Sequence, residues 1–75
     1  MMTFYVLFVR DLANNTSYTK VYSVMMEAYN EMNRIKNSSG NNIFVNVSRH
    51  SFKTRSIKFN ELNNEYFKQH GEYAY

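Results

Sequence analysis

The sequence predicts a small α+β protein in which one main helix packs on an antiparallel sheet, in the order β-β-α-β-β. Only residues 23–36 carry apolar side chains that recur at helical spacing. Residues 3–10, 18–22 and 43–48 are short, rich in aromatic and β-branched side chains, and separated by polar segments that favour turns. A chain of 75 residues supports one thin core, so residues 1–75 are predicted to form a single domain.

The first strand is predicted over residues 3–10 and is apolar on both faces. One face carries Phe4, Val6 and Phe8, and the other carries Tyr5, Leu7 and Val9. A single helix covers only one of these faces, so the other needs cover from elsewhere in the chain. Residues 11–17 contain Asp, Asn, Thr and Ser, which favour a turn, and residues 18–22 alternate as an antiparallel second strand.

The main helix is expected to begin after Ser23, whose hydroxyl can cap the first turn, and to end at Lys36. Residues 37–42 are expected to stop it, with Gly40 able to adopt a positive φ. At about 100° per residue, one contiguous arc of this helix is apolar and is expected to face the sheet. It consists of Val24, Met25, Ala28, Tyr29, Met32 and Ile35. Met26 projects instead from the polar side, with Asn30 and Asn33.

The C-terminal half begins with a strand over residues 43–48. A polar turn over residues 49–53 and a weaker fourth strand over residues 54–59, with Ile57 and Phe59 facing inward, are predicted to follow. Residues 60–75 are expected to form a short C-terminal helix, capped by Asn60 and ending at His70 before Gly71, or a tail. Its aromatic side chains offer cover for the second face of the first strand.

Composition narrows the function classes. The chain has no cysteine, which excludes disulfides and thiolate metal sites and points to a reducing interior. No apolar run approaches the roughly 20 residues that span a bilayer, and the apolar segment 4–9 lacks the features of a signal peptide. We therefore expect a soluble, cytoplasmic protein with no membrane partner. The formal net charge of +3 is ordinary for a small domain and does not by itself indicate a polyanion.

Eleven asparagines, with few alanines and only two glycines, indicate an AT-rich gene. In size and composition the chain resembles the small accessory reading frames of bacteriophages. That resemblance rests on no motif. It implies a factor that acts in the host cytoplasm on a host protein.

Residues 48–58 form the most distinctive local feature, because five basic or imidazole side chains occur there without an acid. They are predicted to form a basic hairpin that binds nucleic acid, with Phe52 stacking on a base. The residues concerned are Arg49, His50, Phe52, Lys53, Arg55 and Lys58. The alternative, which we favour about two to one, is a solvated surface whose lysines discourage pairing at a sheet edge.

No catalytic or metal-binding constellation is recognisable. His50 and His70 lie in separate segments without cysteine, whereas a zinc site needs three or four ligands. Gly40 and Gly71 are isolated, so neither a phosphate loop nor a nucleophile elbow is present. We predict no enzyme activity and no cofactor.

The aromatic surplus favours a protein-binding module. Seven tyrosines exceed what a thin core can bury, and exposed tyrosine and methionine are typical of interfaces. The predicted partner-binding residues are Met26, Tyr18, Tyr22, Tyr73 and Tyr75, with Tyr66 equally assignable to the core. The sequence therefore predicts a small non-enzymatic module that binds and modulates or inhibits another protein. Nucleic-acid binding is the alternative function, and a homodimer is a further alternative partner.

Overall fold

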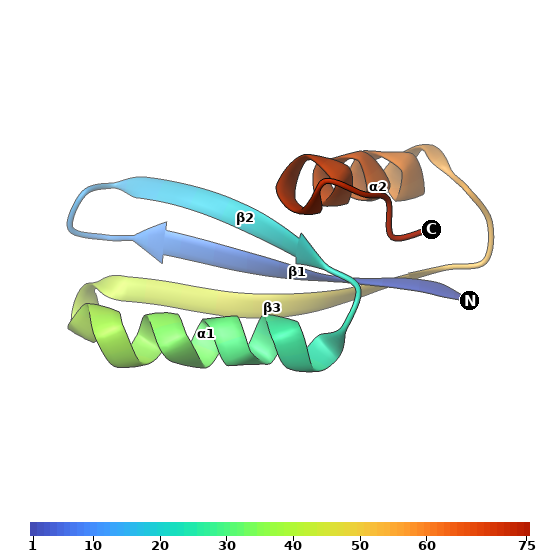
Figure 1. The fold of residues 1–75 in the computed structure, drawn as a ribbon. Coiled ribbons are helices and arrows are strands. Elements are labelled where there is room, and N and C mark those ends of the chain that lie inside the picture. The colour runs from blue at the N-terminus through green and yellow to red at the C-terminus, as the bar shows by residue number, and fades with distance from the viewer.

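A computed structural model describes the backbone of residues 1–75 and the side chains of residues 1–38 and 40–75. The elements follow the order β1 (Met2–Asp11), β2 (Thr16–Tyr22), α1 (Met25–Ser39), a 3₁₀ turn η1 (Gly40–Asn42), β3 (Ile43–Phe52) and α2 (Ile57–His70). β1 lies at the centre of an antiparallel sheet of order β2-β1-β3. The predicted α+β class is confirmed, but the order is β-β-α-β-α and not β-β-α-β-β (Figure 1).

The predicted fourth strand over residues 54–59 is wrong, because this segment enters α2. The Ser56 hydroxyl accepts a hydrogen bond from the Phe59 N–H at 3.2 Å and caps the helix, the role the sequence had assigned to Asn60. Phe59 is fully buried, whereas Ile57 is 80% exposed. Two alternating apolar residues fit a strand, but Phe59 also begins a helical pattern with Leu62 and Tyr66, and that pattern prevails.

The predicted polar turn over residues 49–53 is also wrong, since β3 continues to Phe52. Its last residues pair with the start of β1, where Met2 lies opposite Phe52 and Phe4 opposite His50. The predicted end of the C-terminal helix is confirmed. Gly71 adopts a left-handed conformation with φ of 80°, and its N–H donates to the Phe67 carbonyl at 2.8 Å.

Ser23 does not cap α1 as predicted. Val24 occupies the capping position without a side-chain hydrogen bond, and the helix begins at Met25. The Ser23 hydroxyl instead donates to the Tyr66 hydroxyl at 3.4 Å, which ties the start of α1 to α2.

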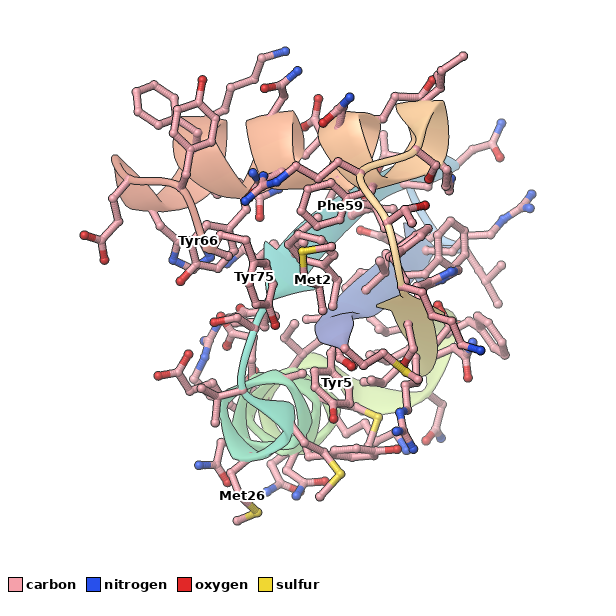
Figure 2. The ribbon with its side chains drawn as sticks, turned by 90° about the vertical axis from the view of Figure 1, so that its right-hand side faces the viewer. Met2, Tyr5, Met26, Phe59, Tyr66 and Tyr75 are labelled. Atoms are coloured by element: carbon pink, nitrogen blue, oxygen red, sulfur yellow. The ribbon has the colours of Figure 1, made fainter. Side chains whose placement is uncertain are left out.

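The two helices cover opposite faces of the sheet (Figure 1). On the α1 side the buried cluster comprises Leu7, Val9, Tyr22, Ala28 and Ile35. On the α2 side it comprises Phe4, Val21, Phe59 and Leu62. The expectation that the C-terminal segment covers the second face of the first strand is therefore confirmed. Figure 2 shows Phe59 reaching down from α2 toward Met2 and Tyr75.

Side chains of α2 close the outer edge of β2. The Val21 N–H donates to Gln69 Oε1 at 2.6 Å, and Gln69 Nε2 donates to the Thr19 carbonyl at 3.0 Å. His70 Nε2 donates to the Val21 carbonyl at 2.7 Å. An open strand edge invites pairing with other chains, and here side-chain groups take the place of a further strand.

The C-terminus closes the same side of β1. β2 ends opposite Tyr5, so the backbone of Thr3 has no strand beside it on that side. The Tyr75 hydroxyl donates to the Thr3 carbonyl at 2.9 Å and accepts from the Thr3 N–H at 3.0 Å. Asn63, buried to 6% exposure, accepts from the N–H groups of Ala74 and Tyr75 and holds this tail in place.

Phe59→Ala should lower the free energy of unfolding by about 3–5 kcal/mol, because it removes a fully buried ring from between α2 and the sheet. Ile57→Ala, two residues away, should change it by less than about 0.5 kcal/mol, because that side chain is exposed. Urea unfolding of both variants measures the difference, and Phe59→Leu gives an intermediate loss if Phe59→Ala fails to fold. Similar losses at positions 57 and 59 would indicate a strand and contradict the helix.

Candidate functional site

The largest group of exposed apolar side chains close together in the chain lies in the first turns of α1. Val24 and Met25 are each 48% exposed, Met26 is 59% exposed and Tyr29 is 39% exposed. Met25 and Tyr29 lie one turn apart on the same side of the helix, and Met26 extends this side around the helix. Figure 2 shows Met26 pointing away from the sheet. We call these four residues the α1 surface.

The rotation of α1 about its axis explains this exposure. Ala28 and Ile35 contact the sheet and are 0% and 5% exposed. Glu31 is half-buried on the side toward β2, where its carboxylate accepts from Lys20 Nζ at 3.1 Å. The buried arc is therefore narrower than predicted and is displaced toward Glu31. Consequently Met25 and Tyr29, which the sequence assigned to the core and which lie on the side away from Glu31, face solvent. Val24, also assigned to the core, is exposed for another reason, because it precedes the first residue of the helix. The exposure predicted for Met26 is confirmed.

The sequence held one sign of this rotation, namely complementary charges on the second strand and on the main helix. Lys20 lies opposite Leu7, on the face that α1 covers, and Glu31 is the acid that reaches it. Glu31 also accepts from Arg34 Nε. The bond from Arg34, together with that from Lys20, holds the pKa of Glu31 below its ordinary value, and the bond to Glu31 raises the pKa of Lys20.

Glu31 and Arg34 line an open depression of about 400 Å³ between α1 and β2. Its lining residues are Tyr22, Glu27, Asn30, Glu31 and Arg34. Burial raises the pKa of the Tyr22 hydroxyl. Glu31 is paired with Arg34 and with Lys20, whereas Glu27 is exposed and makes no ion pair with any side chain that the structure describes.

The structure does not bring the predicted partner-binding residues together. Tyr18 is 48% exposed on the α1 side of β2, but Tyr22 is 9% exposed and belongs to the core. Tyr73 is 56% exposed and stacks on Phe67, with 4.6 Å between ring centroids. Tyr75 is engaged with Thr3 and lies edge-on to Phe4 at 5.4 Å, on the α2 side. Of the five predicted partner-binding residues, only Tyr18 and Met26 are exposed on the α1 side.

The basic segment is likewise dispersed. Arg49 lies on the α1 side, opposite Tyr5, whereas His50 lies on the α2 side, opposite Phe4. Phe52 packs against Phe4 and Phe59, with ring centroids 6.4 and 5.8 Å apart, and is not free to stack on a base.

The other three basic residues of that segment lie beyond β3. Lys53 and Arg55 are in the loop, and Lys58 is in the first turn of α2. The guanidinium carbon of Arg55 lies 5.1 Å from the centre of the Phe59 ring. The six residues form no single surface.

Both histidines take part in local contacts. His50 Nε2 lies 3.0 Å from Ser48 Oγ, and His70 stacks on Tyr66 with 4.1 Å between ring centroids. Among residues 1–38 and 40–75, no three His, Cys, Asp or Glu side chains gather in a way that could hold a metal ion. Within the described structure, no helix is long and apolar enough to cross a membrane.

Comparisons with protein-family models, curated proteins and solved structures found no match for this chain.

Glu31→Gln should lower the free energy of unfolding at neutral pH by roughly 0.5–1 kcal/mol, because partial exposure keeps the ion pair with Lys20 weak. The pKa of Glu31 is lower in the folded protein than the ordinary value of 4.5. The contribution is therefore complete above pH 4.5 and is lost as the pH falls below it through the folded pKa.

Urea unfolding at a series of pH values should thus show the wild type and Glu31→Gln converging in acid. Glu65→Gln is the control, because it removes only the exposed pair with Lys68 and should have a smaller effect at neutral pH. An equal difference between wild type and Glu31→Gln at all pH values would mean that side-chain shape, and not charge, is responsible.

Proposed function

We propose that the protein is a non-enzymatic protein-binding module whose contact surface is the α1 surface. The observation that supports this proposal is the exposure of four large apolar side chains, between 39% and 59%, within six residues of a helix whose core positions are already filled. Single exposed apolar residues are ordinary, but a contiguous group marks an interaction site. Burial of such a group against a partner is the main source of binding free energy.

The side chains themselves suit a protein partner. Methionine is flexible and polarisable, so Met25 and Met26 can adapt to an uneven surface. Tyr29 adds a rigid ring with a polar tip. Polar residues surround the group on the helix, as is usual at the rim of an interface. They are Glu27, Asn30, Asn33 and Lys36, all exposed.

The proposed partner is a host protein, and the support for it is the composition of the chain. The asparagine-rich, cysteine-free chain supports a bacteriophage accessory factor that acts in the host cytoplasm. In this proposal the protein binds a host protein and modulates or inhibits it, because a chain of 75 residues that carries no catalytic constellation acts by occupying a surface.

Met26→Glu should weaken partner binding by about 2 kcal/mol or more, because it places an unpaired charge on the most exposed apolar side chain of the contact. Its 59% exposure means that folding is unaffected. Affinity capture from a nuclease-treated bacterial lysate identifies the partner, and calorimetry with the purified partner measures the loss.

Ile57→Glu is the matched control. It introduces the same charge at a position that is 80% exposed on α2, on the other side of the sheet, and should leave binding unchanged. Capture that retains no stoichiometric partner, or that survives Met26→Glu, would contradict the proposal. Unfolding of Met26→Glu, seen by circular dichroism, would contradict the observed rotation of α1.

A further inference from the structure

One half of the sheet is uncovered on the side opposite α1. Figure 1 shows α2 over the end of the sheet near the chain termini, whereas the end with the β1–β2 turn has no helix on that side. Phe44, at the start of β3, is 54% exposed there, and Phe8 is half-buried. We call this region the open sheet face.

The strand register assembles this face from three strands. Phe8 lies opposite Asn46 on β3 and Thr19 on β2. Arg10 lies opposite Phe44. Residues that are paired across an antiparallel sheet project from the same face, so these five side chains form one surface. Ser48 and the half-buried His50 continue it along β3.

The two aromatic rings of this face lie edge to face outside the core. The centroids of Phe8 and Phe44 are 6.3 Å apart, with 63° between the ring planes. Neither ring belongs to the buried clusters on the two sides of the sheet. Flat aromatic groups on an open sheet are suited to stacking with unpaired nucleobases, and neighbouring amide, hydroxyl and imidazole groups can bond to base edges.

The charge on this face favours an anionic partner. None of the side chains that the three strands project on this side is an Asp or Glu, and Arg10 is the one permanently charged group among them. Asp11 projects from the other face, and its carboxylate accepts from the N–H groups of Ala13 and Asn14. Arg10 lies within 4.0 Å of no carboxylate among the side chains that the structure describes. A second copy of the chain would bring an equally acid-free face against Arg10 and leave it without a counter-charge.

We propose that the open sheet face binds single-stranded nucleic acid, with bases stacked on Phe44 and Phe8 and a backbone phosphate bound by Arg10. A duplex is excluded from this mode, because its bases are already stacked and paired. The six residue steps from Phe44 to His50 span about 20 Å, which provides room for a few nucleotides. This face and the α1 surface lie on opposite sides of the sheet, so the proposal does not depend on the protein-binding function.

Fluorescence anisotropy with a labelled single-stranded oligonucleotide of about 12 residues tests this proposal. Phe44→Ala should lower affinity by about tenfold, the effect of losing one stacked base. Arg10→Ala should reduce the slope of log affinity against log salt by about 0.7, the effect of one phosphate contact on a single strand. Tyr18→Ala is the matched control, because this aromatic residue is 48% exposed on the opposite face of the sheet and should leave affinity unchanged.

Four results would overturn the proposal. They are the absence of binding at low salt, equal losses for Phe44→Ala and Tyr18→Ala, equal affinity for the duplex of the same sequence, and equal affinity for heparin, which has charge but no bases. If light scattering shows a dimer that Phe44→Ala dissociates, the face belongs to a second copy. Circular dichroism of each variant confirms that the loss is not due to unfolding.

Discussion

The burial of both faces of β1 is the constraint on which the rest of the structure depends. Phe4 and Leu7 project to opposite sides of this strand, and both are fully buried. No single layer satisfies such a strand, because each face must be removed from water separately. Hence β1 takes the central position in the sheet, and the chain must supply one helix for each side.

The need to cover the second face of β1 with a helix explains the polar contacts of the C-terminal segment. Once Phe59 and Leu62 are packed on the sheet, α2 ends beside β2, where Gln69 and His70 meet its free backbone groups. Tyr75 does the same for Thr3 beyond the end of β2. Several aromatic residues that composition alone assigned to an interface therefore stabilise the fold. The α1 surface and the open sheet face are two surfaces that remain exposed.

These two surfaces differ in chemistry as well as in position. The α1 surface is built from flexible thioethers and a tyrosine with a mixed-charge rim, which suits a protein partner. The open sheet face combines two phenyl rings with a cation and no acid, which suits unpaired bases on a charged backbone. A sheet that is covered by α1 on one side, and on the other by α2 placed near the chain termini, leaves room for both surfaces (Figure 1).

The sequence by itself determined the two-faced first strand, the hairpin with the second strand, the main helix, the helix end at Gly71 and the exposure of Met26. Each of these depends on local pattern or local backbone chemistry. Only the tertiary structure decided that residues 57–59 join a helix. So short a segment fits both the two-residue period of a strand and the 3.6-residue period of a helix until its packing partners are known. It also decided the rotation of α1, since Lys20 and Glu31 meet only across the fold. The contact between Tyr75 and Thr3 joins the two ends of the chain, and a bond at that separation leaves no local signature.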